Sequence, residues 1–342
     1  MIRLLIAAGL VALFIWNPYP FQYLELKGYD TLIMSAETVQ NDNIILIDID
    51  EEIIKAYGGY PLPRTFYSDF IKRTNVAGIT VLMPDPDIRD RNNDFELAST
   101  MAVKPTVLAS AASTQSQELS IHVGTAELGE DPRPWLYQYP GILRTESIVA
   151  LNAKGLGVVT ATPEIDGVTR RIPLVVNVQS KLYPAFALEV LRVGLDHPSY
   201  QLKTTPEGID WIRVPGYPLM KTDGNGRIFL DWNTKFYKQT VSEFMKSPID
   251  APFAIIGVTA EGIVNPTPTP AGLKYPHEVQ ANILHNLING SAPSTPIWAP
   301  AGELLGLTLG LLLVALTVSS IYISAPVIFS LIGGSMFGAW YL

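Results

Sequence analysis

Apolar, uncharged positions are concentrated at the two ends of the chain. From Leu304 to Leu342 there is no Asp, Glu, Lys, Arg or His, and residues 1–16 carry one charged side chain, Arg3. A single helix over the C-terminal stretch would be roughly 58 Å long, about twice the thickness of a bilayer core. The pattern therefore predicts one transmembrane helix at residues 1–16 and two in residues 300–342, at 301–320 and 326–342.

The N-terminal stretch has a second interpretation, a cleaved signal peptide. Such a peptide ends in small residues, whereas this run ends in Trp16-Asn17-Pro18, which favours an uncleaved anchor. Arg3 favours a cytoplasmic N-terminus. The sequence then predicts a multi-pass protein of the cell inner membrane, in contact with membrane lipid, whose main domain (17–299) lies in the periplasm or the extracellular space.

Between these ends, short apolar runs alternate with helical patterns. Buried strands are predicted at 43–48, 78–83, 105–110 and 253–258. A helix is predicted at 278–289, with Val279, Ile283 and Leu287 on one face and Gly290 as its C-terminal stop. The alternation predicts an α/β fold, a single mixed-sheet domain with flanking helices and parallel strand pairs.

Composition and motifs narrow the function. The net charge is −8 and basic residues form no cluster, so no nucleic-acid partner is expected. Cysteine is absent and the four histidines do not have the spacing of metal ligands, so we expect no metal site and no cofactor. Because the sequence has no P-loop, Gly-x-Gly-x-x-Gly or Gly-x-Ser-x-Gly motif, we predict no catalytic residues and no enzyme activity.

Several segments resemble one protein family in residue type and in order. They are Ile-Leu-Ile-Asp-Ile-Asp-Glu at 45–51, Tyr-Pro-Leu-Pro-Arg at 60–64, the turn Glu-Ile-Asp-Gly-Val-Thr-Arg-Arg at 164–171, Ile-Gly-Val-Thr-Ala at 256–260 and Glu-Val-Gln-Ala-Asn at 278–282. This pattern resembles the CHASE2 domain, an extracytoplasmic sensory module of bacterial receptors. The chain differs in Tyr60, where the family has Trp, and in Gln280, where it usually has His.

The resemblance implies that the chain is the sensory input module of a bacterial transmembrane signalling receptor. Family members usually have three C-terminal spans followed by a cyclase or kinase, whereas only two spans and no effector are predicted here. We therefore expect the effector beyond residue 342 or in another protein, and an unknown extracytoplasmic ligand or protein as the stimulus. The alternative is a membrane-anchored scaffold protein that uses the same fold without an effector.

Two further features bear on partners and ligands. Gly302, Gly306 and Gly310 have the small-xxx-small spacing that brings helices close together, which favours a homo-oligomer. Asp48 and Asp50 lie at the carboxyl end of a predicted strand, and α/β sheets bind ligands beyond the carboxyl ends of their strands.

Together with Arg64, Asp166 and Arg170, these two aspartates are the candidate ligand-binding residues. Each also has a structural interpretation. Asp48 and Asp50 would cap the next helix and pair with Arg64. Asp166 would form a tight turn and bind an arginine.

Overall fold

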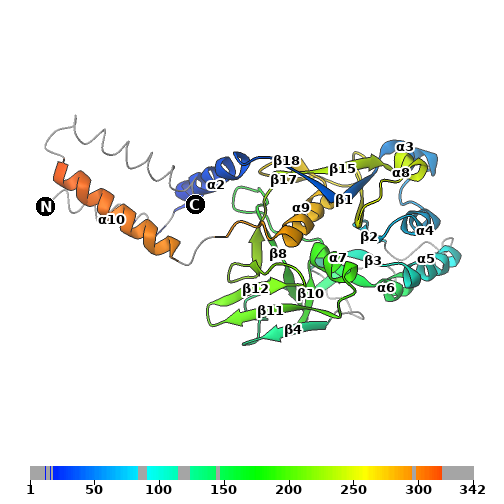
Figure 1. Ribbon diagram of the computed structural model, residues 1–342, viewed down its shortest axis with the longest axis horizontal. Coiled ribbons are helices and arrows are strands. Elements are labelled where there is room, and N and C mark those ends of the chain that lie inside the picture. Colours follow the sequence, from blue (N-terminus) through cyan, green and yellow to red (C-terminus); the bar gives the residue numbers. More distant parts are fainter. Residues whose placement is uncertain are drawn as a thin grey trace. The chain divides into compact units, whose positions relative to one another are not determined.

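A computed structural model describes residues 12, 16, 18–83, 91–114, 124–143, 147–294 and 298–317. The chain divides into two compact units, residues 1–36 with 295–342, and residues 37–294. The first unit contains two described helices, α2 (Tyr19–Met34) and α10 (Ala299–Thr317). The second unit contains all of the described strands and the other helices (Figure 1).

The prediction of three transmembrane helices is wrong for the part of the chain that the structure describes. No helix there is both long and apolar enough to cross a membrane. The helix α10 overlaps the predicted span 301–320 and begins at Ala299. The predicted span 326–342, and the span 1–16 apart from residues 12 and 16, lie outside the described residues.

A seven-stranded sheet forms the centre of the second unit, in the order β15-β1-β16-β2-β3-β6, with β7 also paired to β3. All of its pairs are parallel except β3 with β6. The strands are β1 (Val39–Ile49), β2 (Val76–Ile79), β3 (Thr106–Ser113), β6 (Gly141–Leu143), β7 (Gly155–Val158), β15 (Thr234–Thr240) and β16 (Phe253–Val258). The strand predicted at 253–258 is confirmed in full.

The strand β1 lies between β15 and β16 and is buried on both faces. Four consecutive residues, 44–47, have almost no exposed surface. Consecutive side chains in a strand point to opposite faces. Ile45 and Ile47 pack into one core cluster with helices of one layer, so Ile44, Leu46 and Asp48 point to the other face. A strand buried in this way gives the continuous apolar run that the sequence shows.

Helices cover both faces of the central sheet. One face carries α7 (Phe186–Gly194) and α9 (Pro276–Asn289), which contact each other and the sheet (Figure 1). The opposite face packs with the helices of the main core cluster. These are α3 (Glu51–Ala56), α4 (Arg64–Lys72), α5 (Arg91–Val103), α6 (Ser147–Asn152) and α8 (Val241–Lys246).

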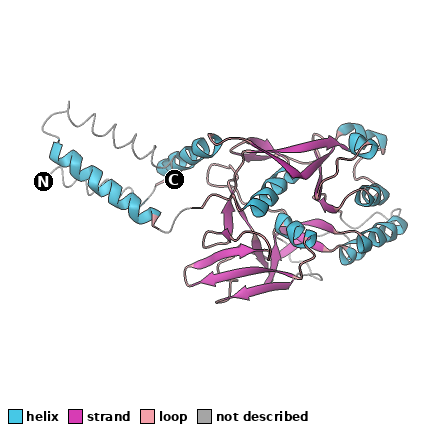
Figure 2. Cartoon of the chain, viewed as in Figure 1, coloured by secondary structure: helices cyan, strands magenta, loops and turns pink. Residues whose placement is uncertain are grey.

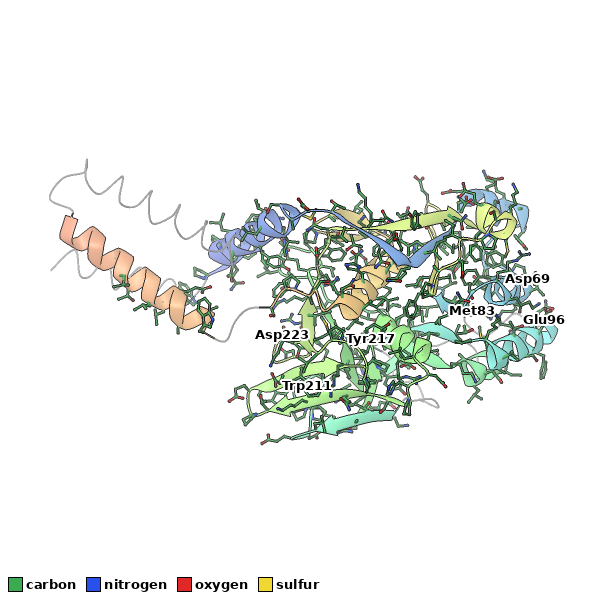
Figure 3. All side chains as sticks on the ribbon, in the orientation of Figure 1. Asp69, Met83, Glu96, Trp211, Tyr217 and Asp223 are labelled. Atoms are coloured by element: carbon green, nitrogen blue, oxygen red, sulfur yellow. The ribbon has the colours of Figure 1, made fainter. Side chains whose placement is uncertain are left out.

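Apolar burial, rather than surface charge, joins the helices α4 and α5. Figure 3 labels Asp69 on α4 and Glu96 on α5, and both accept hydrogen bonds from the Lys72 ammonium, at 3.3 and 3.1 Å. These side chains are about half exposed, so solvent screens both ion pairs and they add little to stability. Phe66 and Phe70 of α4 and Met101 of α5 are instead fully buried in one cluster.

The prediction of a single mixed sheet is wrong, because four smaller sheets accompany the central one (Figure 2). Their strands pair mainly with near neighbours in the chain as antiparallel hairpins, so they do not extend the parallel sheet. Their bounds are β4 (Gly124–Leu128), β5 (Gln138–Tyr139), β8 (Arg171–Pro173), β9 (Val175–Val178), β10 (Lys181–Pro184), β11 (Ser199–Thr205), β12 (Gly208–Arg213), β13 (Met220–Lys221), β14 (Arg227–Phe229), β17 (Thr267–Thr269) and β18 (Gly272–Lys274).

The strand β7 and the first turn of α7 approach so closely that a side chain on the strand cannot fit between them. A Cβ atom on Gly157 would lie 2.3 Å from the Phe186 Cα and 2.8 Å from its nitrogen. Both are backbone atoms of a helix packed against the sheet, so they cannot move away as a side chain could. Glycine at position 157 therefore allows α7 to pack on the sheet.

We predict that Gly157→Ala destabilises the second unit by about 1–3 kcal/mol or more, the usual cost of overpacking a core. Urea unfolding followed by circular dichroism measures this change. Gly124→Ala in β4 is the matched control, because its Cβ would meet only ordinary contacts, the nearest at 3.6 Å. Equal stability of the two variants would contradict the close packing.

Candidate functional site

The two elements that connect the second unit to the first are in direct contact with each other. The strand β1 follows α2, with only residues 35–38 between them, and α9 precedes α10, with residues 290–298 between them. Side chains of β1 and α9 form two hydrogen bonds, one near each end of the helix. This β1–α9 contact is the candidate functional site.

The first hydrogen bond joins Asp48 and His277. The His277 Nε2 lies 2.7 Å from the Asp48 Oδ1. The His277 side chain is fully buried, whereas that of Asp48 is 22% exposed. A carboxylate only accepts hydrogen bonds, so Nε2 carries the proton and donates it. The other ring nitrogen, Nδ1, is buried and has no hydrogen-bond partner among the described residues.

A glycine in the neighbouring strand makes room for the His277 ring. Gly257 in β16 is paired with Asp48 in β1. A Cβ atom on Gly257 would lie 2.3 Å from the His277 Nδ1, so any other residue would displace the ring. This glycine belongs to the Ile-Gly-Val-Thr-Ala segment that the sequence singled out, and the structure gives its physical reason.

The second hydrogen bond joins Asn41 and His285. The Asn41 Oδ1 accepts from the backbone N–H groups of residues 43 and 44, which orients its amide nitrogen toward the His285 Nδ1 at 2.7 Å. Because the amide donates, this ring nitrogen is unprotonated. Burial lowers the pKa of His285, against a smaller opposing effect of the Asp231 carboxylate. The whole His285 residue is buried.

The helix α9 buries four further polar side chains, and three of them reach other elements. The Gln280 Oε1 accepts a 3.1 Å hydrogen bond from the Ala187 N–H in the first turn of α7, which otherwise has no side-chain cap. The Asn286 Oδ1 accepts from the Asp231 N–H at 3.0 Å. Asn282 donates within the helix.

Glu278 binds Lys238 of β15 and accepts from the Tyr275 N–H. Burial alone would raise the pKa of Glu278, but the hydrogen bonds from Lys238 and Tyr275 outweigh it and lower the pKa. Helix α9 thus bonds to β1, β15, α7 and the segment before β15.

The structure assigns separate partners to the other predicted residues near the carboxyl end of β1. Asp50 caps α3, since its Oδ1 accepts a 3.0 Å hydrogen bond from the Ile53 N–H. Arg64 at the start of α4 donates to the Asp94 Oδ1 at 3.0 Å, and both side chains are about 5% exposed or less. The predicted pairing of Asp48 or Asp50 with Arg64 is therefore replaced by a pairing with Asp94.

Asp166 and Arg170 bind each other inside a turn. The Arg170 guanidinium donates two 2.8 Å hydrogen bonds to the Asp166 carboxylate, and both side chains are buried. The Asp166 Oδ1 also accepts from the Val168 N–H, and Gly167 has a φ of 79°. This is the tight turn that the sequence predicts as the structural interpretation. A buried bidentate pair mainly fixes local geometry, since breaking it would leave an unpaired buried charge.

The β1–α9 contact consists of two side-chain hydrogen bonds between the elements, one to each α9 histidine. Its imidazoles and amides are hydrogen-bonded to one another across two elements. In the described ranges, no group of three or more metal-ligating side chains gathers there or elsewhere.

The sequence did not indicate His277, His285 or Asn41 as a site, because partners 229 and 244 residues apart leave no local pattern. The one available signal was the number of polar residues on the helix predicted at 278–289.

Acidification should weaken the contact through His285. The pKa of His285 in the native protein is lowered from its ordinary value of about 6.5. On acidification the unfolded chain therefore binds a proton at His285 before the native protein does, and the free energy of unfolding falls as the pH is lowered below about 7. We predict that wild-type protein loses stability between about pH 7 and pH 5, and that His285→Gln loses less. Urea unfolding at several pH values measures both. Identical pH dependence of His285→Gln and wild type would contradict the prediction.

Comparison with known families gives one match, which covers most of the chain. A family model described as CHASE2 domain matches residues 6–318. Comparison with curated proteins and with solved structures gave no match. The matched range includes the whole of the second unit, with both halves of the β1–α9 contact. The chain therefore belongs to the CHASE2 domain family, an extracytoplasmic sensory module.

Proposed function

We propose that this chain is the input module of a signalling receptor, in which a stimulus outside the cytoplasm changes the packing of α9 against β1. The observation that supports this proposal most is that the two elements leading to α2 and α10 are joined by hydrogen bonds: the His277 ring donates to Asp48, and Asn41 donates to the His285 ring. A change in that contact would therefore act on both connections to the first unit at once.

The contact has the energetics of a switch between two packings. A buried polar group left without a partner costs about 1–3 kcal/mol, so small displacements of α9 are resisted until a hydrogen bond breaks. His277 and His285 lie two turns apart on one rigid helix, so their hydrogen bonds to Asp48 and Asn41 would tend to break together. A stimulus shifts this equilibrium only if it binds one packing more tightly than the other.

The output would be produced by an effector, as the family resemblance implies, of the cyclase or kinase class. Of the five residues predicted to contact a ligand, Asp48 and Asp50 keep partial exposure at the carboxyl end of β1. They remain the proposed contacts for a ligand or partner protein there. Asp166, Arg170 and Arg64 are buried in ion pairs, which favours a structural role for them.

The absence of cysteine allows a direct test on the full chain. Spin labels at Ser35→Cys, next to α2, and at Glu303→Cys, on α10, report the distance between the two helices by electron paramagnetic resonance. In this background Asp48→Ala removes the acceptor of the buried His277 ring. We predict that the distance distribution shifts or broadens.

The matched control is Thr125→Val, which deprives the buried Tyr200 hydroxyl of a 2.8 Å contact in the β4–β11 sheet, away from β1 and α9. It should leave the distance unchanged. An unchanged distance in Asp48→Ala, with the protein folded, would contradict transmission through the contact and would favour a scaffold role.

A further inference from the structure

A cavity of about 570 Å³ lies at the opposite edge of the central sheet from Asp48. Pro105 and Lys154 line it, and they immediately precede the parallel strands β3 and β7, so the cavity is at the amino ends of these strands. The segment from Arg192 to Pro198, at the C-terminal end of α7, forms its other wall. The volume falls in the range of pockets that hold small molecules.

A buried ion pair fixes both walls of this amino-edge pocket. The Arg192 guanidinium donates to both oxygens of Glu189, at 2.8 and 2.7 Å, and Glu189 is fully buried. The same guanidinium donates to the backbone carbonyls of Lys154 and His197, one from each wall. Gly155 leaves space for the Glu189 carboxylate, since a Cβ there would lie 2.3 Å from it. The Arg192 guanidinium thus uses its hydrogen bonds within the protein and fixes the two walls of the pocket relative to each other.

Three other polar side chains of the pocket have no partner. The Lys154 ammonium, the Asp196 carboxylate and the His197 ring make no hydrogen bond or ion pair among the described residues. Asp196 has a φ of 51°, in the left-handed region, which sets the direction of its side chain at a small backbone cost. Since Arg192 and Glu189 neutralise each other, the pocket presents one unpaired cation and one unpaired anion.

We propose that this pocket binds a small zwitterionic molecule of the free amino-acid type. Its carboxylate would lie against Lys154 and His197 and its ammonium against Asp196, while Val193 and Pro198 supply apolar surface for its side chain. A simple anion would meet the Asp196 carboxylate, and a simple cation would meet the Lys154 ammonium. Only a ligand with both charges is complementary to both groups.

The pocket also has a structural route to the β1–α9 contact. Its wall is the C-terminal end of α7, and the N-terminal turn of α7 bonds to Gln280 of α9. The claim that the pocket binds a ligand depends only on the pocket residues, whereas the claim that this ligand is the stimulus rests on the proposed function. The two claims therefore need separate readouts.

The test screens the full-length protein against the common free amino acids at millimolar concentration by thermal unfolding, followed by titration calorimetry of the best one. We expect at least one amino acid to raise the unfolding temperature. Its des-amino acid and its methyl ester, which each lack one charge, should bind at least tenfold more weakly. No binding by any amino acid, or equal binding of the des-amino acid, would overturn the proposal.

Charge-removing variants locate the site. Lys154→Gln and Asp196→Asn should each weaken binding at least tenfold, and asparagine tolerates the left-handed backbone at 196. Lys235→Gln and Asp42→Asn are matched controls, since both residues are exposed and without ion pairs in the described structure. Equal affinity in the pocket variants and the controls would contradict the site. The distance between labels at positions 35 and 303 in Asp48→Ala tests the proposed function independently of this result.

Discussion

The polar side chains of α9 are the constraint on which the rest of the second unit depends. A helix packed against a sheet normally presents apolar residues, yet α9 buries six polar ones, from His277 to Asn286. Each must find a partner or cost about 1–3 kcal/mol. Five of the six find partners in β1, β15, α7 and the segment at Asp231, whereas Asn282 donates within the helix, so α9 can occupy its place only when all of these elements are in register.

The proposed coupling between the second unit and the first therefore runs through one helix. Apolar contacts are non-directional and tolerate sliding, whereas the hydrogen bonds of Asp48 and Asn41 to the α9 histidines specify one position. Glycines at distant points of the sequence allow α9 to take this position. Gly257 leaves room for the His277 ring, and Gly290 ends the helix in the left-handed conformation. The amino-edge pocket reaches the same helix through α7, from the other edge of the sheet.

The sequence predicted the features that depend on local pattern. The strand at 253–258, the helix ending before Gly290 and the turn of Asp166 and Gly167 follow from short apolar runs, a stop signal and turn chemistry. The partners of Asp48 and Arg64 could not be predicted, because they depend on which distant segments meet. The prediction of a single sheet was wrong because strands that pair as separate hairpins show the same alternation of apolar and polar residues as the edge strands of a larger sheet.

Hydrogen exchange on full-length Asp48→Ala most directly tests whether α9 and β1 form one unit. The substitution removes a partner of the first turn of α9 only. If the helix moves as a unit, amides along its whole length, including those beside His285, lose protection together with those of β1. Loss of protection limited to the first turn, around residues 276–280, would contradict the claim that the α9 contacts act together.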